Sequence, residues 1–191
     1  MTYQFYVCGP RTQAPKGVKV VNTTSRGGWS KELSPFYLGP VLTPAGVAKN
    51  VENAWQYSKV YSCHVDDSGS VKEEWHKWRQ EGFDNPKAIR YPMGKGAVPL
   101  YSLWNNEKLA YIEARKKIYA PIYAKLVRET YAMELLREMV KESDVWLWDF
   151  DGYNHKAKGI SYTDVINDPK LKMGHAFVVA MILEEDEVWN K

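Results

Sequence analysis

The apolar positions near the N-terminus fall in two short runs that are typical of β-strands. Residues 3–9 (YQFYVCG) and 17–25 (GVKVVNTTS) are rich in β-branched and aromatic side chains, and each predicts a short strand. Residues 25–46 are rich in glycine, proline and serine and predict a long loop. Long loops of this kind in compact domains often carry functional residues.

The helical period dominates from residue 51 onward. The pattern predicts a helix from Val51 to about Cys63 with Asn50 as its N-cap, and a short helix near the end of residues 66–83. It also predicts a long helical stretch over residues 106–142 that breaks or kinks at Pro121, because proline cannot donate the helical hydrogen bond.

The last third of the chain combines one strand with a closing helix. Residues 144–154 (DVWLWDFDGYN) predict a buried strand that runs into a turn, and residues 84–104 predict an irregular segment. The pair Asp168-Pro169 predicts the start of the last helix, since Pro is favoured at the first helical position. We therefore expect an α+β fold, predominantly helical with a small β-sheet, in a single domain covering residues 1–191.

Length and composition agree with one globular domain. The chain has 191 residues with 45% hydrophobic residues, which suffices for a substantial core. The formal charge of +3 permits an anionic ligand but does not indicate a long nucleic-acid groove. Cys8 and Cys63 form no CxxC pair, so we expect free thiols in a reducing compartment. No apolar stretch approaches a membrane span, and we expect a cytoplasmic protein.

An acid, an amide and a base share one side of the helix predicted at residue 51. On a helical period Glu52, Gln56 and Lys59 fall within a sector of about 60°. Apolar side chains occupy the neighbouring faces. The stripe is therefore either a solvated surface seam or the floor of a functional site.

Other candidate groups are weaker when taken alone. Arg26, beside two glycines, could bind a phosphate, or the segment could be an ordinary loop. Asp149 and Asp151 alternate with aromatic residues at the end of a predicted strand, where side chains reach a cleft, but they could equally cap a turn. Arg90 lies in a basic glycine-containing loop. The four histidines lack the spacing of a metal site, so no metal or other cofactor is expected.

The order of three motifs resembles the NADAR family, NAD- and ADP-ribose-associated proteins. The first motif is a loop with Ser34, Phe36 and Tyr37 followed by E-x3-Q-x2-K, which Glu52, Gln56 and Lys59 match. The other two motifs are the stretch from Glu142 to Trp148 and a closing helix with Gly174 and Met181. The similarity covers roughly residues 31–183. Asp149 stands where family members usually have glycine.

The resemblance implies an N-glycosidase that cleaves the bond between a nucleobase or amine and a ribose phosphate moiety. Some NADAR proteins remove ADP-ribose from guanine in DNA and serve as antidotes to ADP-ribosylating toxins, so the expected partner is ADP-ribosylated DNA and no membrane. The chemistry suggests Glu52 as the carboxylate that stabilises charge on the ribose C1 or activates water, and Lys59 as an amine nucleophile. Further residues are expected to bind substrate: Gln56, Arg26, Ser34, Phe36, Tyr37, Trp104, Trp148, Asp149, Asp151, Tyr153 and Asn154.

Three alternatives stay open at the level of sequence. A binding module could hold ADP-ribose without cleaving it, and a transferase could attach ADP-ribose from NAD. An interaction protein could instead use an aromatic surface, and in that case Trp29, Trp75, Trp78 and Trp189 should be exposed together.

Overall fold

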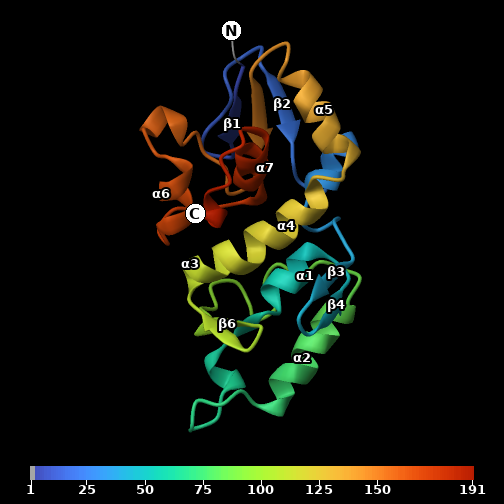
Figure 1. Ribbon diagram of the computed structural model, residues 1–191, viewed down its shortest axis with the longest axis vertical. Coiled ribbons are helices and arrows are strands. Elements are labelled where there is room, and N and C mark those ends of the chain that lie inside the picture. Colours follow the sequence, from blue (N-terminus) through green and yellow to red (C-terminus); the bar gives the residue numbers. More distant parts are fainter. Residues whose placement is uncertain (1–2) are drawn as a thin grey trace.

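The computed structural model describes residues 3–191 and has an α+β fold with three small sheets rather than one. Helix α4 crosses the middle of the molecule and lies between an upper half and a lower half (Figure 1). The strands are β1 Phe5–Cys8, β2 Lys19–Asn22, β3 Val41–Thr43, β4 Gly46–Ala48, β5 Lys59–Val60, β6 Tyr101–Trp104, β7 Glu107–Leu109 and β8 Val145–Trp148. The helices are α1 Val51–Gln56, α2 Glu73–Asp84, α3 Tyr111–Ala114, α4 Ala120–Val127, α5 Tyr131–Met139, α6 Tyr162–Asn167 and α7 His175–Leu183, with a π-helical segment η3 at Arg115–Tyr119 and short 3-10 segments η1 Gly28–Leu33, η2 Ser62–His64, η4 Lys156–Lys158 and η5 Val188–Asn190.

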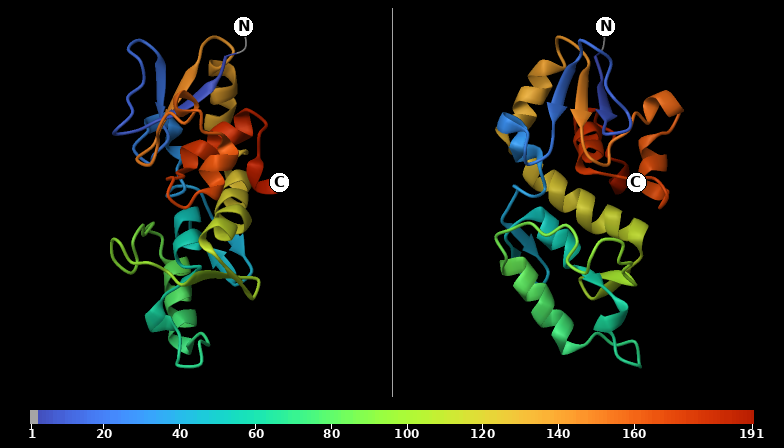
Figure 2. Two further views of the ribbon diagram at one scale, coloured as in Figure 1. Left: turned by 90° about the vertical axis from the view of Figure 1, so that its left-hand side faces the viewer. Right: turned by 180° about the vertical axis from the view of Figure 1, so that it is seen from behind.

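The upper half is built on a parallel sheet with the order β1-β8-β2. The central strand β8 is buried on both faces, which explains why its sequence VWLW is apolar throughout. Helix α7 packs against β1 and β8 and is buried along almost its whole length. The three strands run in the same direction, so their carboxyl ends lie together at the edge of the sheet that faces α4 (Figure 2).

The lower half contains α1, α2, the β3-β4 hairpin and the antiparallel sheet β5-β6-β7. Asn50 caps α1, because its side chain accepts a hydrogen bond from the backbone N–H of Asn53 at 2.8 Å. Helix α1 packs against α2, where Gly82 leaves room for the ring of Tyr57. A single cluster of buried apolar side chains extends through both halves, and this continuity agrees with one domain.

The helix predicted from Val51 to Cys63 is correct at its start and wrong at its end. Helix α1 stops at Gln56, and Lys59 begins strand β5, which pairs with Ser102 of β6. The backbone N–H of Leu103 also donates to the carbonyl of Ser58. The chain leaves the helix because pairing with a distant strand satisfies its backbone, and local periodicity does not contain this information.

The helical stretch predicted over residues 106–142 is wrong at its start, because residues 107–109 form strand β7 and the helix begins at Tyr111. Near Pro121 the helix is irregular, with the π-helical segment η3 directly before α4, and the stretch also breaks at residues 128–130. The predicted start of the last helix is wrong as well. Pro169 follows the end of α6 rather than starting the last helix, which begins at His175 with Gly174 as N-cap. The guanidinium of Arg115 donates to backbone carbonyls of residues 165, 166, 168 and 171 and holds this turn from a distant helix.

Smaller differences concern the segments predicted to be irregular. Residues 25–46 contain the 3-10 segment η1 and strand β3, and residues 84–104 end in strand β6. The strands predicted near the N-terminus and at residues 144–154 are confirmed, as is the helix within residues 66–83. Cys8 and Cys63 are free thiols. None of the helices in residues 3–191 is long and apolar enough to cross a membrane.

Candidate functional site

A cavity of about 510 Å³ opens where the two halves meet, beyond the carboxyl ends of β2 and β8. This is the position at which parallel sheets of α/β type usually bind ligands, and the volume is in the range of ligand sites. Its walls come from the loops before and after η1, from α1 and β5, from η3, and from the segments after β8 and before α7. The lining residues include Glu52, Gln56, Lys59, Arg26, Ser34, Phe36, Asp149 and Asp151, all of them expected from the sequence.

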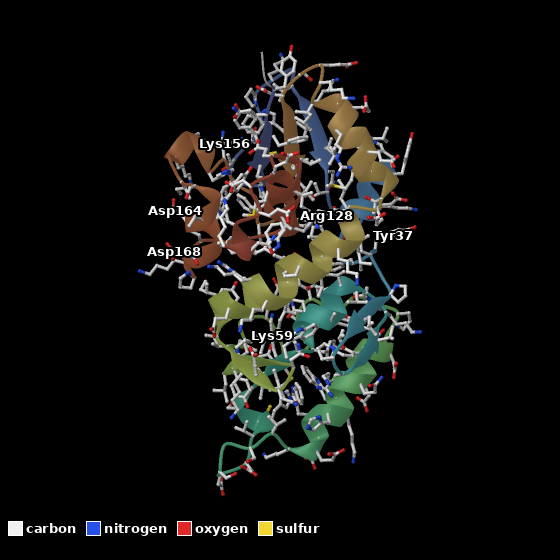
Figure 3. All side chains as sticks on the ribbon, viewed as in Figure 1. Tyr37, Lys59, Arg128, Lys156, Asp164 and Asp168 are labelled. Carbon is white, nitrogen blue, oxygen red and sulfur yellow. The ribbon has the colours of Figure 1, made fainter. Side chains whose placement is uncertain are left out.

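Glu52, Gln56 and Lys59 form a continuous line of hydrogen bonds along one wall of the cavity. The Nε2 of Gln56 donates to the Oε1 of Glu52 at 2.9 Å, and the Nζ of Lys59 donates to the Oε1 of Gln56 at 2.6 Å. The Gln56 amide donates one hydrogen bond and accepts the other, so it links the Lys59 amine to the Glu52 carboxylate, which are not in direct contact. Figure 3 shows Lys59 in the lower half of the molecule, below α4. The three residues therefore meet although Lys59 lies on a strand and not on α1.

Burial shifts the pKa of both ends of this line toward the uncharged form. Removal from water raises the pKa of Glu52 to about 7, although the hydrogen bond from Gln56 and the charge of Lys59 oppose the rise. Burial lowers the pKa of Lys59 to about 8, partly offset by the charge of Glu52. The ammonium also lies 4.6 Å from the centroid of the Trp55 ring. Both groups can exchange protons near neutral pH, which suits an acid–base pair or an amine nucleophile.

Asp149 supplies a second buried carboxylate at the end of β8. Its Oδ2 lies 3.3 Å from the Nδ1 of His175, and the backbone N–H of Ala176 donates to the same oxygen at 3.4 Å. The Nε2 of His175 lies 2.8 Å from both the carbonyl and the hydroxyl of Thr23. A Cβ on Gly174 would come within 1.9 Å of the Asp149 Oδ2, so glycine is required there for the carboxylate to approach α7.

Cationic side chains gather at the open side of the cavity. Asp151 binds two of them, with its Oδ2 at 2.9 Å from the Nη2 of Arg90 and its Oδ1 at 3.0 Å from the Nζ of Lys172. Arg26 is exposed on the loop after β2 and takes part in no ion pair within residues 3–191. Arg26 is thus available to an incoming anion, whereas Asp151 is already neutralised by its two partners.

Aromatic rings line the cavity from its floor to its mouth. Trp55 and Tyr119 are buried in the floor, with ring centroids 5.3 Å apart. Burial raises the pKa of Tyr119 well above its usual value, with the charges of Glu52 and Asp149 adding to the rise, so its hydroxyl stays protonated. Exposed rings surround the mouth, where flat groups could stack on them: Phe36, Tyr91, Tyr111 and Phe150.

Five residues expected to bind substrate do not line this cavity. Tyr37 is exposed at the edge of the molecule, away from Lys59 in the view of Figure 3. Trp104 lines a second, smaller cavity. Trp148 and Tyr153 pack edge-on or tilted against Phe150 and Phe177 respectively, and the side chain of Asn154 accepts a hydrogen bond from the backbone N–H of Ala157. Trp148, Tyr153 and Asn154 come close to the site in sequence, but packing and turn formation use their side chains.

Several residues of the cavity were not expected from the sequence. His175 and Lys172 precede or begin α7, and Tyr119 lies in η3, within a stretch that reads only as an amphipathic helix. Arg115 also lines the cavity, but its guanidinium is occupied by backbone carbonyls and by the hydroxyl of Tyr111 at 2.9 Å. Arg115 therefore has a structural role in the wall of the cavity. No local pattern singles out any of these four residues.

The tryptophans named for an interaction surface are not exposed together. Trp75 and Trp189 are buried and Trp78 is partly buried, while Trp29 alone is largely exposed at 46%. They do not form one aromatic surface patch. Within residues 3–191 no group of three or more His, Cys, Asp or Glu side chains could hold a metal ion.

Comparison with known proteins identifies a family without an assigned activity. No curated protein and no solved structure matches the chain. A family model matches residues 11–166, which include the line from Glu52 to Lys59 and both aspartates of the cavity, but not His175. The chain belongs to the Family of unknown function (DUF6939).

Proposed function

We propose that the protein is an N-glycosidase that hydrolyses the bond between a nucleobase or amine and the ribose of ADP-ribose. The observation that carries the proposal is the buried hydrogen-bonded line of Glu52, Gln56 and Lys59 on the wall of a ligand-sized cavity. Its end groups have pKa values of about 7 and about 8, so both change protonation near neutral pH. The resemblance to NADAR proteins favours ADP-ribosylated guanine in DNA as the substrate.

The chemistry uses Lys59 as a nucleophile and Glu52 as the acid–base group. The uncharged amine of Lys59 attacks C1 of the ribose, a C–N bond to lysine forms, and the bond to the base breaks with its electron pair moving to the base. The base takes up the proton that the attacking amine releases. Opening of the ribose ring gives a Schiff base, which water hydrolyses to free the sugar and restore the amine. Glu52 stabilises the positive charge at C1 and activates the water.

The remaining walls supply groups for the rest of such a substrate. The exposed guanidinium of Arg26 suits bidentate binding of a pyrophosphate, and the Lys172 and Arg90 side chains add positive charge beside it. Asp149, fixed by His175, offers carboxylate oxygens that suit hydrogen bonds from ribose hydroxyls. The exposed rings at the mouth can stack on a nucleobase. We place the activity in the cytoplasm, where it would reverse ADP-ribosylation of DNA.

The test is incubation of purified protein with a single-stranded oligonucleotide that carries one ADP-ribosylated guanine, with released ADP-ribose read by mass. Wild type should release ADP-ribose, whereas Glu52→Ala and Lys59→Ala should not. Glu129→Ala and Lys125→Ala remove the same side chains from exposed positions outside the cavity and should retain activity.

The other outcomes separate the competing functions. Tight binding of ADP-ribose without release would contradict the glycosidase and indicate a binding module. Consumption of NAD in the absence of a modified oligonucleotide would indicate a transferase. Release that is equal in wild type and Lys59→Ala would remove the nucleophile from the mechanism.

A further inference from the structure

A second cavity, of about 310 Å³, lies in the lower half behind strand β5. Ser58 lines this cavity while the next residue, Lys59, lines the first one, so the chain entering β5 separates the two. The walls are formed by α2, by the turn of the β3-β4 hairpin and by the β6-β7 hairpin. The reaction proposed above does not use this cavity.

Arg79 in this cavity carries a positive charge without a partner. Its Nε is buried and has no hydrogen-bond partner, and no ion pair within residues 3–191 includes it. Its guanidinium lies 4.5 Å from the ring centroid of Trp75, which fixes its orientation. Trp75 is itself held, because its Nε1 donates to the carbonyl of Lys59 at 2.9 Å.

The other arginines that are at least partly buried have hydrogen-bonding or ionic partners. Arg115 donates to several carbonyls, Arg90 binds Asp151, and Arg128 binds Glu187. Burial lowers the pKa of Arg79, since the charged form loses solvent, but a guanidinium keeps its proton at neutral pH. A partly buried charge whose N–H group makes no hydrogen bond lowers the stability of the fold unless an anion binds beside it.

The rest of the cavity suits an anion that carries a flat apolar body. No aspartate or glutamate is among its lining residues, while the ring of His76 adds a further hydrogen-bonding group. Asn105 and Asn106 adopt positive φ values of 49° and 62°, which turns the β6-β7 hairpin, and both residues line the cavity. The apolar walls come from Phe83, Leu103, Trp104, Pro44 and Ala45.

We propose that this cavity is a binding site for a small organic oxyanion, a carboxylate or phosphate group on an aromatic or apolar body, with Arg79 as its anchor. The planar guanidinium of Arg79 matches either oxyanion, and its two Nη groups, which make no hydrogen bond within residues 3–191, can donate the two parallel bonds of a bidentate contact. The volume is near the lower end of ligand cavities, so the ligand is smaller than ADP-ribose. The site is separate from the first cavity, and its occupation does not depend on the glycosidase activity.

The experiment follows the Nε–H resonance of Arg79 by NMR while the full chain is titrated with benzoate, phenyl phosphate, inorganic phosphate or uncharged benzyl alcohol. Benzoate or phenyl phosphate should shift the resonance in a saturable way, and benzyl alcohol should not. Arg79→Gln should weaken binding of the effective probe by about tenfold or more, the scale of a charge-assisted contact. Arg79→Lys keeps the charge without the fork and should give an intermediate loss.

Two controls make the result decisive. Arg137→Gln removes an exposed arginine outside both cavities and should leave binding unchanged. Arg26→Gln, which alters only the first cavity, should also leave the Arg79 shift in place. No shift with any anionic probe, equal binding by Arg79→Gln, or a shift that disappears in Arg26→Gln would overturn the proposal.

Discussion

Replacement of Glu52 by glutamine should stabilise the folded protein, and only at neutral and alkaline pH. The reference pKa of this side chain is 4.5 and burial raises it to about 7 in the folded chain. At about 1.4 kcal/mol for each pKa unit, ionised Glu52 is about 3 kcal/mol less favourable in the folded chain than in the unfolded chain. The side chain is almost fully buried, so solvent does little to screen this penalty.

The sign of the pH dependence follows from a raised carboxyl pKa. The stability linked to Glu52 is complete below pH 4.5 and is lost as the pH rises toward the folded pKa of about 7. Glutamine keeps the acceptor for Gln56 but carries no charge. Lys59 loses its counter-charge in the variant, but with a pKa of about 8 it can release its proton at little cost at pH 8.

The assay is urea unfolding followed by tryptophan fluorescence at pH 4.5 and at pH 8. We expect Glu52→Gln to match wild type at pH 4.5 and to be more stable by about 1 to 3 kcal/mol at pH 8. Glu129→Gln, at an exposed position, should change stability by less than about 0.5 kcal/mol at either pH. A Glu52→Gln variant that is less stable at pH 8, or equally shifted at both pH values, would refute the assigned burial of an ionisable carboxylate.

Three further predictions concern the cavity and its supports. Gly174→Ala should displace the Asp149 carboxylate, because the new Cβ would lie 1.9 Å from its Oδ2; ADP-ribose binding measured by calorimetry should weaken by about tenfold while circular dichroism stays unchanged. Arg115→Met should destabilise the fold by about 3 kcal/mol or more in urea, since four backbone carbonyls, at buried or partly buried positions, lose this donor; a loss under about 1 kcal/mol would contradict its structural role. The value of kcat/KM for release of ADP-ribose should rise with pH through the pKa of Glu52 near 7 and that of Lys59 near 8, because both act in their deprotonated forms; an activity that falls over this range would exclude an amine nucleophile.

The sequence predicts the local elements better than their ends. The apolar run of β8 and the cap of α1 are visible locally, and both elements form where expected. The end of α1 was not predictable, because strand pairing between Lys59 and Ser102 decides it over a long separation in the chain. The turn at Pro169 likewise depends on the guanidinium of Arg115, about fifty residues earlier.

In the candidate site, too, local contacts follow from the sequence and contacts between distant elements do not. Glu52 and Gln56 are one helical turn apart, so their proximity follows from the period of α1. Lys59 remains within hydrogen-bond reach of Gln56 although the helix has ended. The three side chains therefore meet as predicted, but Lys59 lies on strand β5 and not on the predicted helix. His175 joins Asp149 only through the packing of α7 against β8, which no spacing in the sequence reveals.

The central claim is that Lys59 attacks the ribose within the cavity, and reductive trapping tests it most directly. Borohydride added during turnover of an ADP-ribosylated oligonucleotide reduces a Schiff base to a stable secondary amine. We predict that the reduced ADP-ribosyl adduct is found by peptide mass spectrometry on Lys59, and that Glu52→Gln changes its yield but not its position. Active protein that gives no adduct, or an adduct on another lysine, would contradict the account.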